Sequence, residues 1–379
     1  MRFRAFAVLA LASLIVWAAP LAGLAIAGRP VAVFVGFPPR TAQVMQMPFA
    51  WSMFIALSLP AFGALALFGA AIARARPRQA GAIAAGFPWW GWLGAALIAG
   101  VWPIAWTDGL VAPAWRAHAF SLLWLGYILA MNGLAWRRSG TSLLTHRTPW
   151  FLALFALSAG FWWLFEYLNQ FVHNWYYTGA EAMSGWDYFV RATLPFSTVL
   201  PAVASTWAWL RRHPRLDAMA LPAVRGNTAS AWIALAAGAL ALAAIGIRAD
   251  LLFPVLWIAP VLVLAGLQQL VLGETIFSPL ARGDWRPTLQ PALAALICGF
   301  FWELWNYGSL PKWHYSIPYV QRFHLFEMPL LGYAGYLPFG IECALVMDLA
   351  ARFVERRRLW PPEGEAKIGV MRTFSTTTR

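Results

Sequence analysis

The chain has 379 residues, of which 61% are hydrophobic and only 11% are charged. Soluble domains carry about 25% charged residues, so no soluble fold could bury this much apolar surface, and lipid must cover much of it. The formal net charge of +13 could indicate nucleic-acid binding, but the arginines lie in short clusters between apolar runs and form no single basic face. The composition therefore predicts an all-α polytopic membrane protein that binds no nucleic acid.

Ten apolar segments are long enough to cross a bilayer, because about 20 apolar residues span its ~30 Å hydrocarbon core. The first resembles a signal peptide, but its apolar run is long, and we interpret it as an uncleaved span. We expect the spans at 4–27, 49–73, 87–107, 115–136, 149–170, 189–210, 229–247, 251–272, 289–307 and 329–353.

The arginines alternate with these spans. Every second loop is basic, as in Arg137 and Arg138 after span four and Arg211 and Arg212 after span six, whereas the loops between them contain fewer arginines. Because basic loops stay on the cytoplasmic side, the alternation predicts ten spans in the bacterial inner membrane with both termini in the cytoplasm. The polar tail, 359–379, is predicted to be disordered.

An internal repeat is visible in two long segments. Glu166-x-x-Asn169 at the end of one span is followed by Trp175-x-Tyr177, and Glu303-x-x-Asn306 is followed by Trp313-x-Tyr315. Upstream residues match as well, at an offset of 133 to 137 residues. Corresponding helices of the two copies are four spans apart. Because this number is even, they cross the membrane in the same direction, so we expect two parallel copies related by an axis along the membrane normal.

These boundaries divide the chain into five parts: N-terminal spans at 1–110, a first repeat at 111–215, a connecting span at 216–248, a second repeat at 249–358 and the tail at 359–379.

The two Glu-x-x-Asn pairs admit three interpretations. A carboxylate costs about 2.5–3.5 kcal/mol near the centre of a membrane helix, so Glu166 and Glu303 are expected to face the bundle interior. They could clamp the two copies together through hydrogen bonds, take part in substrate or proton chemistry, or lie at the membrane interface. The following Trp and Tyr residues fit an interfacial aromatic belt, but their repeated spacing also fits the walls of a pocket.

The second copy carries polar groups that the first lacks. Glu327 and Glu342 bracket a stretch with three glycines and two prolines, which argues against one regular helix. Either a span begins near Pro329 and kinks at Pro338, or Pro338 begins the helix and the preceding segment is re-entrant. In the second model, Glu342 lies close to Glu303.

The histidines, the cysteines and the search for phosphate-binding motifs give little further indication of chemistry. His173 and His314 flank the loop tryptophans and could be solvated, donate protons or bind metal, but no metal-binding spacing supports the last role. Cys298 and Cys343 lie in apolar stretches without a CxxC motif, so they predict no disulfide or zinc site. Phosphate-binding and diphosphate motifs are absent, which disfavours ATP-driven chemistry.

At this point two resemblances appear. A helix-end carboxylate, a loop Trp-x-Tyr and a proline-led helix with an early Glu are similar to the small-repeat lycopene cyclases, whose short helical repeats carry a Pro-x-Glu-Glu motif. Here Pro338-Phe-Gly-Ile-Glu342-Cys343 has one carboxylate, two positions late. The Trp-rich doubled unit also resembles a group of bacterial polytopic membrane proteins to which no activity is attached.

These patterns lead to three hypotheses. The first is a membrane enzyme that acts on an isoprenoid, carotenoid-like or other apolar lipid near the outer leaflet, with Glu303, Glu342 and Asn306 as catalytic groups facing one pocket. Its substrate-binding residues would be Glu166, Asn169, Trp175, Tyr177, Trp302, Trp313, Tyr315 and Glu327. The second is a parallel-repeat transporter or flippase for a lipid or small organic solute, which should need both Glu166 and Glu303. The third is a scaffold without a small-molecule site; no cofactor or protein partner is indicated.

Overall fold

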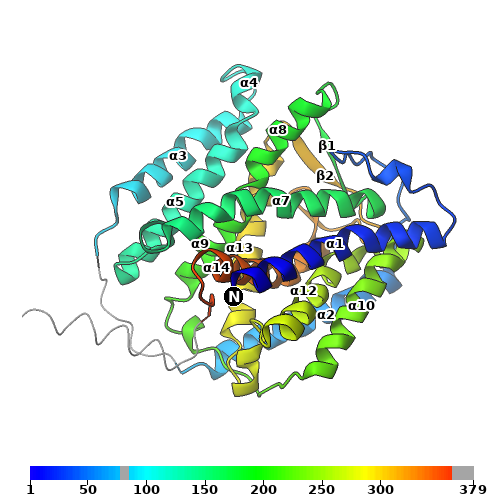
Figure 1. The fold of residues 1–379 in the computed structure, drawn as a ribbon. Helices are drawn as coiled ribbons and strands as arrows, with labels where there is room; N and C mark the ends of the chain where they lie inside the picture. Colours follow the sequence, from blue (N-terminus) through cyan, green and yellow to red (C-terminus); the bar gives the residue numbers. More distant parts are fainter. Residues whose placement is uncertain (77–84, 361–379) are drawn as a thin grey trace, which may run out of the picture.

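The computed structural model describes residues 1–76 and 85–360, and these form mainly α-helices (Figure 1). The long helices are α1 (Arg2–Ile26), α2 (Trp51–Arg74), α3 (Trp89–Trp106), α5 (Ala119–Ser139), α7 (Thr148–Val172), α8 (Gly185–Phe196), α9 (Val199–Leu210), α10 (Thr228–Ile247), α12 (Ala259–Leu272), α13 (Arg286–Tyr307) and α14 (Tyr336–Val354). Short α-helical turns are α4 (Pro113–Arg116), α6 (Leu143–His146) and α11 (Ala249–Leu252), and 3₁₀ turns are η1 (Ala32–Phe34), η2 (Leu216–Ala218), η3 (Phe253–Trp257), η4 (Ser278–Arg282) and η5 (Leu330–Gly335).

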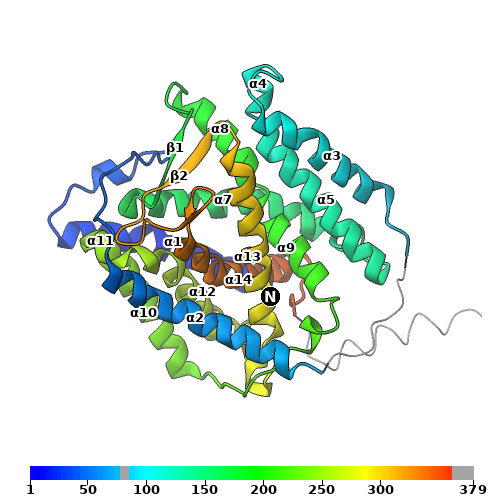
Figure 2. The ribbon, with the colours of Figure 1, turned by 180° about the vertical axis from the view of Figure 1, so that it is seen from behind.

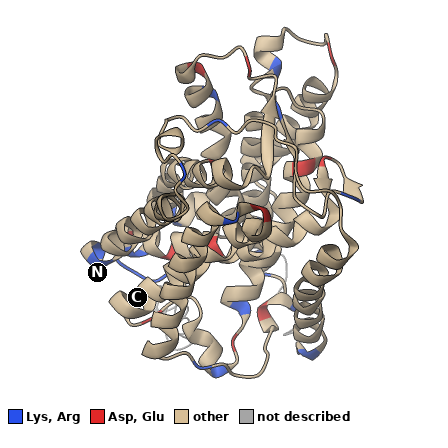
Figure 3. Cartoon of the chain, turned by 90° about the vertical axis from the view of Figure 1, so that its right-hand side faces the viewer, with Lys and Arg blue, Asp and Glu red and all other residues tan. Residues whose placement is uncertain are grey.

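Six helical segments of the described chain are long and apolar enough to cross a membrane: Arg2–Ile26, Trp51–Arg74, Pro113–Ser139, Thr148–Val172, Thr228–Ile247 and Arg286–Tyr307. A bent pair, Ala249–Trp257 and Ala259–Leu272, would make a seventh. The chain is therefore built as a multi-pass membrane protein, and charged residues are sparse along its long helices (Figure 3). The predicted count of ten spans is not confirmed.

Three expected spans are not among these segments. The one expected at 87–107 forms α3, a helix of only 18 residues, and the other two differ from the expectation for physical reasons. The span expected at 189–210 is divided into α8 and α9, with Pro195 just before the break. The span expected at 329–353 is shortened, because α14 begins only at Tyr336 and carries three charged residues, Glu342, Asp348 and Arg352. The residues before α14 form strand β4 (Met328–Pro329) and the turn η5, so the helix does begin close to Pro338.

The bundle is packed around α13 and α14, which lie at its centre between α3 and α5 on one side and α2 and α10 on the other (Figure 2). Small residues allow close helix crossings, as is usual where lipid gives helices no hydrophobic reason to associate. A Cβ on Gly126 of α5 would come within 2.9 Å of the carbonyl oxygen of Gly94 on α3, so glycine is required at this crossing.

The two loops that follow α7 and α13 pair with each other. Strand β1 (Trp175–Thr178) runs antiparallel to β2 (Lys312–Tyr315), with Trp175 opposite Tyr315, Tyr176 opposite His314 and Tyr177 opposite Trp313. A second small ribbon joins β3 (His324–Leu325) to β4. The β1–β2 ribbon lies at the end of the molecule toward which α7 and α13 both run (Figure 1).

The irregular connection from α1 to α2 lies against both loops. The Gln46 side chain donates to the carbonyl oxygens of Val172 and His173, and Ala50 and Tyr319 are joined by a backbone hydrogen bond of 3.0 Å. At the opposite end of the molecule, the Trp360 ring stacks on Trp207 with ring centroids 6.0 Å apart. The rest of the tail that we predict to be disordered, 361–379, lies outside the described residues.

Candidate functional site

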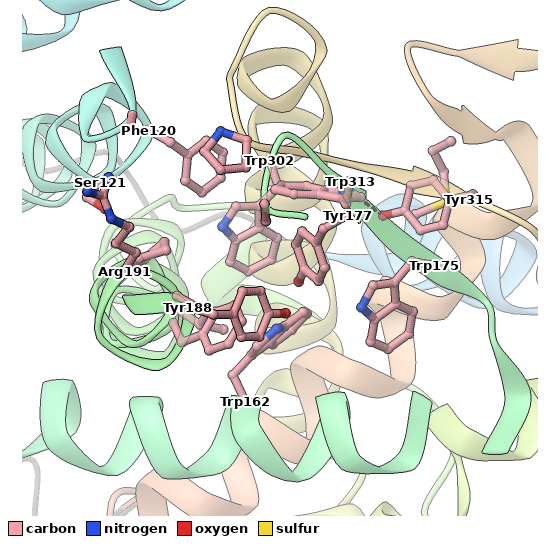
Figure 4. A pocket seen from close by; sticks show the side chains of 18 of the residues that line it. Phe120, Ser121, Trp162, Trp175, Tyr177, Tyr188, Arg191, Trp302, Trp313 and Tyr315 are labelled. Atoms are coloured by element: carbon pink, nitrogen blue, oxygen red, sulfur yellow. Dashed lines mark hydrogen bonds between the residues drawn. The ribbon is translucent and has the colours of Figure 1, made fainter. Parts of the chain in front are cut away.

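An aromatic cavity of about 140 Å³ lies beside the β1–β2 ribbon (Figure 4). Its walls come from α5, α7, α8, α9, α13, η3, η5, α14 and both strands of the ribbon. Aromatic side chains dominate the lining: Phe120, Trp162, Trp175, Tyr177, Tyr188, Phe196, Trp257, Trp302, Trp313, Tyr315 and Tyr336. Arg191 is the only charged residue among the lining residues that the structure describes. The cavity can therefore enclose an apolar or cationic group between ring faces.

Glu166 lies behind the first part of this wall. It is 1% exposed, and one of its oxygens, Oε1, accepts three hydrogen bonds. The donors are the Tyr177 hydroxyl at 2.6 Å, Trp175 Nε1 at 3.1 Å and Trp162 Nε1 at 3.0 Å, and all three of these side chains line the cavity. Burial of the carboxyl group is thus compensated by donors from the cavity wall.

Glu303 has a corresponding place beside β2, the other strand of the ribbon. It is 0% exposed, and its Oε1 accepts hydrogen bonds from the hydroxyls of Tyr315 and Tyr336, each at 2.7 Å. Trp313 Nε1 donates to the Tyr315 hydroxyl at 2.9 Å and so extends the network. The other carboxyl oxygen, Oε2, is buried without a hydrogen-bond partner in the described part of the chain.

The two asparagines fix the loops to their helices in the same way. Asn169 Nδ2 donates to the Trp175 carbonyl at 2.7 Å, and Asn306 Nδ2 donates to the Trp313 carbonyl at 2.8 Å. Each Oδ1 accepts from the backbone N–H of the same tryptophan, at 3.3 Å and 2.9 Å respectively. The sequence motif therefore encodes a turn that returns the chain to the end of its helix.

Buried tyrosines of the ribbon stay protonated at neutral pH. Burial, and next the neighbouring Glu166, raises the pKa of the Tyr177 hydroxyl well above its usual value of 10.0. Burial and the neighbouring Glu303 have the same effect on the pKa of Tyr315. Both hydroxyls are consequently hydrogen-bond donors to their carboxyl groups.

Glu342 is not at this cavity, which corrects the expectation that Glu303 and Glu342 face one pocket. Glu342 is 3% exposed and lines a second, smaller cavity of about 30 Å³ between α1, α7, α12 and α14. The reason is the helix start: α14 begins at Tyr336, so Glu342 is in the second turn and Tyr336, not Glu342, reaches Glu303. Its Oε2 has no hydrogen-bond partner in the described part of the chain.

Glu327 and the two loop histidines also lie away from the cavity lining. Glu327 forms an ion pair with Lys312 at 2.5 Å and contacts His314 Nδ1 at 3.1 Å, which ties the loop before β4 to β2. Nδ1 of His173 is 3.3 Å from the Ala42 carbonyl oxygen. Within the described residues, no group of three or more His, Cys, Asp or Glu side chains is arranged to hold a metal ion.

Of the predicted binding residues, Trp175, Tyr177, Trp302, Trp313 and Tyr315 line the cavity, and Glu166, Asn169, Glu303 and Asn306 lie directly around it. The sequence patterns do not single out the other six aromatic lining residues, Phe120, Trp162, Tyr188, Phe196, Trp257 and Tyr336. Tyr336 stands in the unusual Gly/Pro stretch, but only the helix start decides where its ring points. Tyr188 lies on α8, outside both repeated motifs, and carried no signal.

Comparison with protein-family models, with curated proteins and with solved structures found no match. The class of the molecule therefore follows from its own structure: a multi-pass helical membrane protein with an aromatic cavity and two glutamates buried behind the cavity wall.

Proposed function

We propose that this protein is a membrane enzyme that binds an isoprenoid or similar apolar lipid in the aromatic cavity and moves protons on it. The supporting observation is the combination of eleven aromatic lining residues with two carboxyl groups that accept hydrogen bonds from the lining tyrosines. A purely structural cavity would need no carboxyl groups, and each buried carboxyl group is costly.

The reaction class is proton-initiated isomerisation or cyclisation. A proton adds to one carbon of a C=C bond, a positive charge develops on the partner carbon, and loss of a proton from a neighbouring carbon gives an isomer. Atoms and electrons balance without an oxidant or a cofactor. Ring faces of Trp302 and Trp313 would stabilise the developing cation, as cation–π attraction allows.

The carboxyl groups would act through the tyrosines. When a substrate proton passes to the oxygen of Tyr315 or Tyr336, the hydroxyl proton of that tyrosine passes to Glu303, so no tyrosinate accumulates. The reverse sequence delivers a proton. Glu166 and Tyr177 form a second such pair beside strand β1.

We also propose that the two Glu-x-x-Asn units are repeats related by a two-fold axis. The register of the ribbon supports this proposal: Trp175 faces Tyr315 and Tyr177 faces Trp313, which is the self-complementary pairing that a two-fold axis through Tyr176 and His314 would produce. The matching Asn169 and Asn306 contacts agree with it. The finer membrane topology, ten spans with an axis along the membrane normal, belongs to the same proposal.

This near-symmetry also supports the alternative of a transporter, in which Glu166 and Glu303 would form a pair of equivalent coupling sites around one cavity. The two functions differ in how much they depend on each copy. Only Glu303 has two tyrosine donors and an unpaired oxygen, so an enzyme should depend more on Glu303 than on Glu166.

The deciding experiment compares Glu303→Gln with Glu166→Gln in cells whose membrane lipids are profiled by mass spectrometry, together with lipids extracted from the purified protein. We expect an isoprenoid-type lipid to co-purify, and its product to disappear in Glu303→Gln but only decrease in Glu166→Gln. An isoprenoid-chain tertiary amine, a mimic of the cation, should displace the lipid. Equal loss in both variants would favour transport, and co-purification of no apolar lipid would contradict the proposal.

A further inference from the structure

Far from the aromatic cavity, several arginines crowd the end of the molecule where α7 and α13 begin and α9 ends. Arg147 pairs with Glu355, and Arg286 pairs with Asp284 and Asp217. Arg211 and Arg212, directly after α9, have no acidic partner within hydrogen-bonding distance among the described residues. The one carboxylate that acts on Arg211 from nearby, Asp217, is paired with Arg286, so neither arginine has an ion pair of its own among the described residues.

Arg211 is held in place by aromatic rings. Its guanidinium carbon lies 4.4 Å from the ring centroid of Trp360 and 5.7 Å from that of Trp207, and these two rings are stacked with an interplanar angle of 3°. The guanidinium group of Arg286 lies 5.3 Å from the same Trp360 ring. Rings fix the position of a guanidinium group but leave its N–H donors without an anion.

Arg212 adds a second positive charge beside Arg211, and its own hydrogen bonds go to neutral groups of the protein. Its side chain donates to the Ser139 hydroxyl at 2.6 Å, to the hydroxyl and carbonyl oxygens of Thr141, and to the Ala208 carbonyl. All these acceptors are neutral, so the charge of Arg212 remains. Burial and the nearby Arg212, Arg147 and Arg286 lower the pKa of Arg211 to about 10 although Asp217 acts in the opposite direction, so an anion at this place would be favoured electrostatically.

We propose that Arg211 binds the phosphate of an anionic membrane lipid, in the field of Arg212 and on the platform of Trp207 and Trp360. A planar guanidinium group matches phosphate oxygens with two parallel hydrogen bonds. The position favours a lipid over a free ion, because the site lies at the ends of the candidate spans α7 and α13, where headgroups lie, and tryptophan is enriched there. This site is independent of the chemistry proposed for the aromatic cavity.

The experiment uses the full chain in mild detergent and measures binding of dioleoylphosphatidylglycerol by native mass spectrometry, with dioleoylphosphatidylcholine as the neutral-headgroup control. We expect selective binding of the anionic lipid, and binding about tenfold weaker in Arg211→Gln, since one charge-assisted contact is lost. The matched control is Arg215→Gln, an exposed arginine of the same loop, which should bind the lipid as the parent chain does.

Arg211→Lys is the second variant, to be used if Arg211→Gln does not fold. It keeps the positive charge but loses the planar guanidinium contact, so we expect lipid binding between that of the parent chain and that of Arg211→Gln. Equal binding of both lipids, or unchanged binding in Arg211→Gln and Arg211→Lys, would overturn the proposal. Competition of the lipid by millimolar inorganic phosphate would show a free-anion site instead and would overturn the assignment to a lipid headgroup.

Discussion

At the scale of single residues, Asn169 and Asn306 determine how each loop leaves its helix. Both residues are 0% exposed, and each side chain satisfies the backbone N–H and carbonyl groups of the first tryptophan in the ribbon strand that follows its helix. A buried backbone group without a partner costs about 1–3 kcal/mol, so these two asparagines position the cavity walls rather than react with a substrate.

We therefore expect Asn306→Ala to lower the free energy of unfolding by about 2–4 kcal/mol, because two backbone groups of Trp313 lose their partners. Asn306→Asp keeps the acceptor and should cost less. Thermal unfolding in detergent measures both changes, and Asn169→Ala should cost at least as much as Asn306→Ala, because the Asn169 side chain also donates to Thr41 Oγ1 and accepts from the backbone N–H of Asn174. A change of less than about 0.5 kcal/mol in Asn306→Ala would contradict this role.

The three buried glutamates differ in their partners, and that difference can be measured. Replacing Glu342 by Met should leave stability unchanged or raise it by about 1–3 kcal/mol, since its Oε2 is unpaired and the second cavity is lined mainly by apolar groups. Glu166→Met is the matched control and should be destabilising, because three donors lose their acceptor. Destabilisation by Glu342→Met comparable to that of Glu166→Met would show that Glu342 has a partner.

At the scale of elements, the β1–β2 ribbon and its neighbouring loop form one wall of the cavity, and Glu327 ties them together. Burial by itself would raise the pKa of Glu327, but the hydrogen bond from Lys312 and the charges of His314 and Lys312 bring it below its usual value of 4.5. A carboxyl group whose pKa is lowered in the folded state stabilises that state above its unfolded pKa and loses this effect as the pH falls through the folded value.

Acid should therefore loosen the ribbon below about pH 4.5. In thermal unfolding between about pH 3 and pH 6, the melting temperature of the parent chain should fall more steeply at the acidic end than that of Glu327→Gln. Identical acid profiles for the parent and Glu327→Gln would refute the contribution of this ion pair.

Much of this arrangement is predictable from local patterns. The Glu-x-x-Asn and Trp-x-Tyr spacings predict Glu166, Glu303 and four of the cavity residues, because burial of a carboxyl group in an apolar helix requires partners nearby. The place of Glu342 was not predictable, since it depends on where a helix begins within a stretch of Gly and Pro. The pairing of β1 with β2 joins residues that are 134 to 140 positions apart in the chain, and the sequence shows that the loops are similar but not that they touch.

At the scale of the whole molecule, α7 separates two groups of loops. Its 25 residues span about 38 Å, more than the hydrocarbon core of a bilayer. The end at Arg147 pairs with Glu355, and Arg138 and Arg212 lie together near that end of the bundle. The other end leads into β1, which is paired with β2. If α7 crosses the membrane, the loops around Arg138 and Arg212 lie on one side, and both strands lie on the other.

Single cysteines test this arrangement, because both native cysteines, Cys298 and Cys343, are buried and should not react with a water-soluble maleimide. We expect Glu181→Cys and Arg322→Cys, both at exposed positions beyond the ribbon strands, to be labelled from the same side in intact cells. Arg137→Cys and Arg215→Cys, exposed at the opposite end, should react only after the membrane is made permeable, since arginine-rich loops are retained in the cytoplasm. The grouping of the four positions and the orientation of the protein are tested separately. If Arg137→Cys and Arg215→Cys react in intact cells and the other two positions do not, the grouping stands, but the orientation inferred from charge is reversed. Labelling of Glu181→Cys and Arg137→Cys from one side would mean that α7 does not cross the membrane, and the span count would have to be revised.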